Sequence, residues 1–140
     1  MKHSIEQKNE FKILGWKRHM SCYSQIDGME NEWAIQNTGR NKGDQYNVEL
    51  PASAAGASSG FVYAIGRLYE DTMKADGYEI ITIPGGRYVV FPVPEEDLDD
   101  VGHFKGQIHE FITTAGYECV GTEIEHIKTS TEIEVSFLIA

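Results

Sequence analysis

Glu125, a carboxylate on a predicted strand, is the group in this sequence best suited to bind a charged ligand. Glu123 and Glu125 lie in segment 117–127, which is predicted to be a β-strand. Strand alternation places Glu123, Glu125 and Ile127 on one face and Ile124 on the other. A carboxylate in an aromatic-walled cleft can hold a cation, to which each good ring contact adds about 0.5–2 kcal/mol. A carboxylate-rich sheet face is most often simply solvated, so the pattern alone leaves both interpretations open.

Aromatic residues are numerous enough to line such a cleft as well as to fill a core, with seven Tyr, six Phe and two Trp. Tyr63 and Tyr88 lie among apolar residues on predicted strands, where a buried hydroxyl needs a partner or a cleft. Trp33 lies on the apolar face of a predicted helix, and Tyr46 on a short strand could reach the same cleft. For each of these rings, packing in the core is the alternative. Desolvation in such a cleft would raise the pKa of Glu125, so that protons and cations compete for it.

Other chemistries find little support in the residue pattern. The five histidines lack the spacing of metal ligands, and no haem-ligand signature is present. Cys22 and Cys119 are too few for a disulfide scaffold, and we expect two buried free thiols. There is no Gly-x-Ser-x-Gly string, and the turn at 84–86 lacks the lysine and the helix of a phosphate-binding loop. We therefore predict no metal, no cofactor and no catalytic nucleophile.

Composition limits the classes of protein to which the chain can belong. Its 140 residues suffice for one domain with a core and a small pocket. The 22 acidic residues outnumber the 12 basic ones and give a formal charge of −10, which disfavours direct nucleic-acid binding and attracts small cations. Because we find neither an apolar run of 18 residues nor a secretion signal, we predict a cytoplasmic protein that does not bind a membrane.

Hydrophobic periodicity predicts a polar lead-in at residues 1–10, followed by a single domain at 11–140. In the first half of that domain, Asp27 and Glu30 have the spacing of a capping box at the start of a helix that ends before Gly39. The other elements predicted there are a strand at 11–23, a turn at 41–44, strands at 45–50 and 61–70, and a flexible small-residue loop at 50–60.

The second half repeats this order of elements. It contains a strand at 78–92 that is broken at 84–86, a helix at 101–115 that ends at Gly116, and strands at 117–127 and 131–139. Each half is therefore strand, helix, strand, strand, without similarity residue by residue. Two such repeats predict an α+β domain of pseudo-twofold symmetry, with an antiparallel sheet and its helices on one side.

Three local strings occur within this order of elements. They are FVYAIG at 61–66, ITIPGGRYVVFP at 81–92, and IHEFITTAGY at 108–117 followed by IEHI at 124–127. In their order and spacing, together with the helix that carries Trp33, they resemble the GyrI-like small-molecule-binding domain. That domain is the effector-binding domain of drug-responsive bacterial transcription regulators. The resemblance spans about residues 11–139.

The resemblance implies two strand-helix-strand-strand units with a central ligand cleft between them. Glu125 takes the place of the family's central carboxylate, which meets cationic ligands in drug-sensing members, and Ile127 follows it on the same strand face. The positions of Tyr63, Tyr88 and the Trp33 region match aromatic positions that line the family's cleft.

Two positions depart from the family's pattern, so the shape of the pocket is expected to differ. Phe111 stands where many members have Trp, and Ile127 stands where the pattern has Tyr. The predicted ligand-binding residues are therefore Glu125, Tyr63, Tyr88, Trp33, Ile127, Tyr46 and Phe111.

The leading functional hypothesis is a stand-alone effector-binding domain that senses or sequesters a lipophilic, cationic small molecule. Because its predicted elements include no DNA-binding segment, a partner or an absent segment would have to contact DNA if it regulates transcription. The first alternative is a hydrolase of reactive electrophiles in which Glu125 activates water and Tyr63 or Tyr88 acts as the acid. The second is a protein interaction of the gyrase-inhibitor type, in which the acidic surface mimics DNA.

Overall fold

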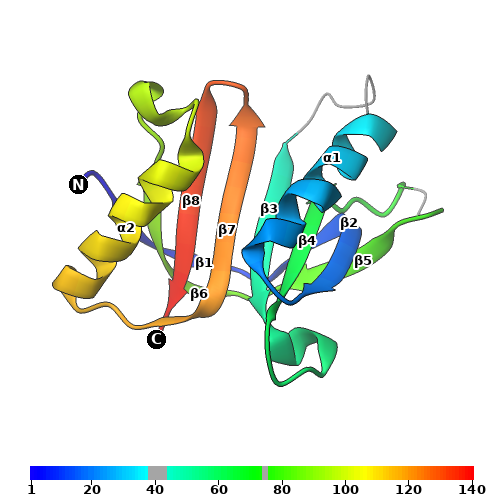
Figure 1. Cartoon of the computed structure of the whole chain (residues 1–140), viewed down its shortest axis with the longest axis horizontal. Helices are drawn as coiled ribbons and strands as arrows, with labels where there is room; N and C mark the ends of the chain where they lie inside the picture. Colours follow the sequence, from blue (N-terminus) through cyan, green and yellow to red (C-terminus); the bar gives the residue numbers. More distant parts are fainter. Residues whose placement is uncertain (38–43, 74–75) are drawn as a thin grey trace.

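A single antiparallel sheet organises the protein. The computed structural model describes residues 1–37, 44–73 and 76–140. Two α-helices lie over the same face of the eight-stranded sheet (Figure 1), which confirms the predicted α+β class. The strands are β1 (Ser4–Lys8), β2 (Phe11–Met20), β3 (Gln45–Pro51), β4 (Phe61–Leu68), β5 (Glu79–Ile83), β6 (Gly86–Pro92), β7 (Cys119–Thr129) and β8 (Glu132–Ile139), and the helices are α1 (Ile26–Gln36) and α2 (Val101–Ala115).

The sheet is built from the two predicted units. One contains β2, α1, β3 and β4, and the other contains β6, α2, β7 and β8. The strand order β1-β6-β8-β7-β3-β4-β2-β5 places equivalent strands symmetrically about the central pair of β7 and β3. Hydrogen bonding between these two strands therefore joins the units into one sheet.

The two outer strands are exchanged between the units. β1 precedes β2 in the sequence but pairs with β6, with Ser4 opposite Val90. β5 precedes β6 but pairs with β2, with Phe11 opposite Ile83. Residues 1–10 are largely exposed, as their polarity suggests, yet segment 4–8 forms the edge strand β1. The prediction of a lead-in missed this strand because an edge strand with little burial on either face needs no alternation of apolar residues.

The chain passes from one unit to the other at residues 9–10 and again at 84–85, and these two crossings touch. A Cβ atom at Gly85 would lie 2.6 Å from the backbone nitrogen of Glu10, so only glycine fits at this close approach. The Tyr88 hydroxyl donates a hydrogen bond of 2.6 Å to the carbonyl of Pro84. The break predicted at 84–86 is thereby confirmed as the boundary between β5 and β6.

The two helices begin differently. α2 has the predicted bounds: Asp100 caps its start by accepting a hydrogen bond from the backbone of His103, and Gly116 ends it with a positive φ of 81°. α1 follows the short 3-10 helix at Tyr23–Gln25, and no side chain caps its first turn. The predicted capping box is therefore wrong. Asp27 already lies inside the helix, and Glu30 has a different role.

Apolar side chains pack on both faces of the sheet. Beneath α2, Phe104 and Ile108 pack on β6 and β8, and beneath α1, Met29 and Trp33 pack on β2 and β4. A third cluster on the face without helices brings together residues from both units: Ile13, Val48, Leu50, Val62, Ala64, Ile81, Ile83, Tyr88, Val90 and Ile124. This burial on both faces fixes the strand register at the centre of the sheet.

Three smaller expectations concern segments outside the core. Cys22 and Cys119 are free but exposed rather than buried, because one lies between β2 and the 3-10 helix and the other at the first residue of β7. The loop predicted as flexible contains a short 3-10 helix, Ala52–Ala55. The turn predicted at 41–44 lies outside the described residues except for Asp44. Among the described residues, no helix is long and apolar enough to cross a bilayer.

Close packing of β2 on β4 makes Gly15 sensitive to substitution. Gly15 lies opposite Gly66, and a Cβ atom there would lie 1.8 Å from the carbonyl oxygen of Ile65. We expect Gly15→Ala to lower the free energy of unfolding by about 1–3 kcal/mol, measured by urea denaturation. As a control, Gly28→Ala in α1 meets no atom within 4 Å and should stabilise the fold by about 0.5–1 kcal/mol. Equal stability of Gly15→Ala and the wild type would contradict the packing described.

Candidate ligand-binding site

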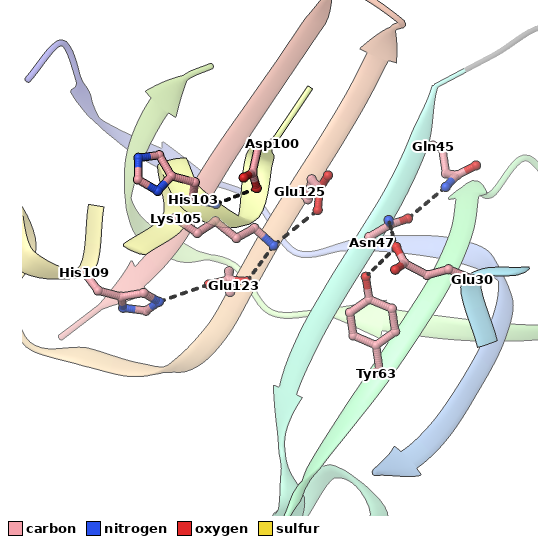
Figure 2. A network of polar contacts seen from close by, with 10 residues as sticks. All are labelled: Glu30, Gln45, Asn47, Tyr63, Asp100, His103, Lys105, His109, Glu123 and Glu125. Atoms are coloured by element: carbon pink, nitrogen blue, oxygen red, sulfur yellow. Dashed lines mark hydrogen bonds and ion pairs between the residues drawn. The ribbon is translucent and has the colours of Figure 1, made fainter. Parts of the chain in front are cut away.

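Polar side chains gather on the helix side of the sheet, where β3 pairs with β7. The register places Asn47 opposite Glu125 and Glu49 opposite Glu123, so four polar side chains share this face at the join of the two units. Side chains from both helices and from β4 complete the group (Figure 2). We call it the junction site, and it consists of Glu30, Asn47, Glu49, Tyr63, Lys105, His109, Glu123 and Glu125.

Lys105 of α2 bridges the two carboxylates of β7. Its Nζ lies 3.0 Å from Oε2 of Glu123 and 3.2 Å from Oε2 of Glu125 (Figure 2). Burial alone would lower the pKa of Lys105, but the charges and hydrogen bonds of the two carboxylates raise it above its usual value. Burial opposes ionisation of Glu123, yet His109 and Lys105 together hold the pKa of this carboxyl below its usual range. Lys105 and Glu123 therefore form a charged pair at neutral pH.

Glu30, like Glu49, is a carboxylate of this site that forms no ion pair with the described residues. Its Oε2 accepts hydrogen bonds from Nδ2 of Asn47 at 3.1 Å and from the Tyr63 hydroxyl at 3.4 Å. Among the described residues, no lysine, arginine or histidine forms an ion pair with it. Burial raises the pKa of Glu30, and the negative charges of Glu125 and Asp27 raise it further.

A chain of hydrogen bonds fixes the groups that face Glu30. The Trp33 indole donates to Oε1 of Gln45 at 3.2 Å, and Nε2 of Gln45 donates to Oδ1 of Asn47 at 2.9 Å. Because Oδ1 of Asn47 is occupied, its amide nitrogen points to Glu30 (Figure 2). Burial raises the pKa of Tyr63, so its hydroxyl stays protonated and can donate. The donors around Glu30 are therefore held in place before any ligand arrives.

A cavity of about 280 Å³ lies beside the junction site, lined by Glu49, His109, Cys119, Gly121, Thr122, Glu123 and Phe137. Burial raises the pKa of Glu49, and the charge of Glu123 raises it further. Four carboxylates face one ammonium group in the junction site, so its net charge is −3 when all four are ionised and His109 is neutral. Such an excess of partly buried negative charge favours binding of a positively charged group.

The structure brings four of the predicted ligand-binding residues to this face. Glu125 and Tyr63 are members of the junction site. Trp33 lies behind it and acts through its hydrogen bond to Gln45. Ile127 pairs with Gln45 and follows Glu125 on the same strand face. Alternation along β7 accounts for Glu125 and Ile127 sharing a face, whereas Tyr63 and Trp33 were predicted from the resemblance.

The other three predicted residues lie elsewhere. Tyr46 points to the face without helices, where its ring stacks on His126 at 4.2 Å and lines a separate cavity of about 270 Å³. Tyr88 is fully buried in the core on that same face. Phe111 lies on the side of α2 away from the junction site, where its ring packs against His3 and against Phe91 of β6. These three residues therefore do not belong to the junction site.

Several members of the junction site were missed by sequence reasoning. Glu30 was assigned to a helix cap, although its spacing from Met29 and Trp33 places it beside the buried face of α1. Asn47 and Glu49 alternate with Tyr46 and Val48 in the same strand, which was a usable signal. Lys105 and His109 are separated by one helical turn, but neither had a partner that the sequence could identify.

Comparisons with known proteins agree with this description of the fold. Residues 4–139 match the family model described as Cass2, integron-associated effector binding protein. This match confirms the predicted effector-binding domain. Among curated proteins, none is similar enough to the chain to count as a relative.

Solved structures share the fold at low sequence identity. SAV2435 bound to tetraphenylphosphonium has a TM-score of 0.79 and 16% identity, covering 100% of this chain and 94% of that one. The EcmrR C-terminal domain has a TM-score of 0.59 and 12% identity, covering 99% and 97%. A hydrolase from Listeria innocua has a TM-score of 0.54 and 8% identity, covering 99% and 92%. At these identities the likeness is one of fold.

The raised pKa of Glu30 predicts how stability depends on pH. The folded protein holds this proton more tightly than the unfolded chain, so stability is lost as the pH rises through the folded-state pKa. We expect Glu30→Gln to be more stable than the wild type at pH 7, with a smaller advantage below about pH 4.3, the ordinary pKa of Glu. Urea midpoints measured across this pH range check the prediction. A less stable Glu30→Gln protein at pH 7 would contradict it, and Glu132→Gln at an exposed position is the control.

Proposed function

Because the chain belongs to the Cass2 family of integron-associated effector binding proteins, we propose that its junction site binds a lipophilic organic cation. In this proposal the protein holds the cation without chemical change and acts as a sensor or a sequestering protein. The observation that carries the proposal is Glu30, a half-buried carboxylate whose pKa the charge of Glu125 helps to raise, with hydrogen-bond donors but no ion-pair partner among the described residues.

Charge is the first reason to propose a cation. An organic cation near Glu30 and Glu125 would gain from both carboxylates and would relieve the repulsion between them. An anion would face the opposite balance, with the single ammonium of Lys105 already bound by two carboxylates. The formal charge of −10 on the whole chain would also attract cations from a distance.

Apolar surface beside the charges is the reason to propose a lipophilic cation. The Tyr63 ring is almost fully buried next to Glu30, within the apolar cluster beneath α1. The exposed Tyr23 stacks on Phe61 at 4.7 Å between ring centres, and its interaction with Glu49 contributes to the raised pKa of Tyr23. Such rings add cation–π attraction and contact area. That SAV2435 has been seen with tetraphenylphosphonium supports the choice of this ligand class.

The test uses tetraphenylphosphonium as the cationic probe. Tetraphenylborate, an anion of nearly the same shape, is the control ligand. We expect calorimetric titration to detect binding of the phosphonium and no binding of the borate. Glu125→Gln and Glu30→Gln should each weaken binding at least about tenfold, because each removes a charge that the cation would meet. The matched control is Glu132→Gln, which removes the same charge from an exposed position at the start of β8 and should leave the affinity unchanged.

Two results would count against this proposal. Equal affinity for the phosphonium and the borate would show that hydrophobic contact alone drives binding. Unchanged affinity in both Glu125→Gln and Glu30→Gln would place the ligand outside the junction site. A circular dichroism spectrum like that of the wild type is required of each variant.

Binding without turnover is the second part of the proposal, and it distinguishes a sensor from the hydrolase alternative. The Tyr63 hydroxyl is held protonated by its buried setting and already donates to Glu30, so it orients a carboxylate. We expect a reactive epoxide to be recovered unchanged, by mass spectrometry, after long incubation with excess protein. Diol formation that is lost in Glu125→Gln or Glu30→Gln would support a hydrolase instead.

We also propose that this domain does not itself contact DNA. Its excess of ten negative charges would repel a phosphate backbone. Any effect on transcription would therefore pass through a DNA-binding partner or a segment outside this domain, and the protein-interaction alternative would require a partner with a basic surface. In both cases the measurement is recovery of that partner in a pull-down at increasing salt concentration, and recovery should fall if the contact is electrostatic.

A further inference from the structure

Lys105 holds the place that a ligand cation would take at Glu125. Its ammonium group lies within 3.2 Å of carboxylate oxygens on both Glu123 and Glu125, at the centre of the junction site (Figure 2). We propose that Lys105 is a resident cation which a ligand must displace from Glu125, and that it thereby sets the threshold affinity a cation must exceed. This inference rests on the proposed function and concerns the same site.

The ammonium group can leave Glu125 without movement of its helix. α2 is anchored by Phe104, Ile108 and Ile112, which are buried against β6 and β8. Lys105 is not one of these anchors, and its flexible four-carbon stem carries the charge across to β7. Rotation about the bonds of this stem is therefore enough to open one side of Glu125.

The two carboxylates that bind Lys105 differ in their other partners. Glu123 also lies 3.7 Å from Nε2 of His109, whereas Glu125 has no second cationic partner among the described residues. Displacement from Glu125 alone would leave Lys105 paired with Glu123 at 3.0 Å. The cost of displacement is therefore one ion pair, and the freed carboxylate faces Glu30, the other carboxylate that the ligand would meet.

Displacement by this route predicts which cations the site rejects. Tetramethylammonium has no N–H group to replace the hydrogen bond that the lysine ammonium makes to Glu125, and it offers little apolar area. A lipophilic cation adds buried apolar area, at about 25 cal/mol per Å², to the same electrostatic attraction. The wild-type protein should therefore bind tetraphenylphosphonium but not tetramethylammonium.

The test is to replace Lys105 with Met, which keeps an unbranched apolar stem and removes the charge. Both cations displace the same ammonium, so we expect Lys105→Met to tighten binding of tetraphenylphosphonium about tenfold or more and to make binding of tetramethylammonium measurable. The matched control is Lys128→Met, which changes the net charge equally but removes ion pairs to Glu132 and Glu134 at the end of β7. It should change neither affinity by more than about twofold.

A double variant separates release of Glu125 from a mere change of charge. Lys105→Met with Glu123→Gln keeps the junction site at the wild-type charge, since one positive and one negative group are removed together. It also avoids an uncompensated carboxylate pair, so it carries the test if Lys105→Met alone does not fold. We expect this double variant, too, to bind tetraphenylphosphonium more tightly than the wild type.

The possible outcomes separate this inference from the proposed function. If the wild type binds tetraphenylphosphonium and neither variant binds it more tightly, the inference is overturned and the proposed function stands. If only the variants bind it, Lys105 masks the site in the way inferred, and the proposed function of the wild type is overturned. If no protein binds it, both are overturned.

Discussion

The pairing of β3 with β7 is the constraint on which the rest of the structure depends. It joins the two units, and its register sets Asn47 opposite Glu125 and Glu49 opposite Glu123. A shift of one residue would turn these polar side chains toward the apolar cluster on the other face and expose Val48 and Ile124 on the helix side. The buried positions of Val48 and Ile124 therefore hold the acidic residues where both helices can reach them.

Charge at this join has a thermodynamic consequence for the fold. Acidic side chains on neighbouring strands repel one another, and burial raises the pKa of both Glu30 and Glu49. The fold tolerates them because Asn47 and Tyr63 donate to Glu30 and because Lys105 neutralises part of the charge on β7. If the junction site binds a cation as proposed, it therefore costs stability while no cation is bound.

The sequence predicts elements better than it predicts the directions in which side chains point. The bounds of α2 could be predicted because Phe104, Ile108 and Ile112 mark one helical face between Asp100 and Gly116. Alternation likewise grouped Glu123 with Glu125. It could not tell which strand face meets the helices, because residues 61–66 of β4 are buried on both faces. Tyr63 lies on the face that meets the helices, whereas Tyr46 and Tyr88 lie on the opposite face.

Long-range pairing explains what the sequence could not reveal. β1 is held by β6, which follows it by some eighty residues, and nothing in segment 4–8 itself signals burial. Glu30 has the spacing of a cap with Asp27, and only its contacts with β3 and β4 reveal its direction. In both cases the deciding interaction joins residues far apart in the chain.

The pseudo-twofold symmetry relates Glu30 to Lys105, and the opposite charges of these two residues make the junction site electrostatically asymmetric. Each is the fifth residue of its helix, and each follows a buried apolar residue, Met29 in α1 and Phe104 in α2. Equivalent positions in the two units therefore direct side chains of opposite charge toward the same join. The lysine meets two carboxylates on β7, while the glutamate meets only neutral donors on β3 and β4. A symmetric scaffold thus produces an asymmetric site, with its cation bound on one side and an unpaired carboxylate on the other.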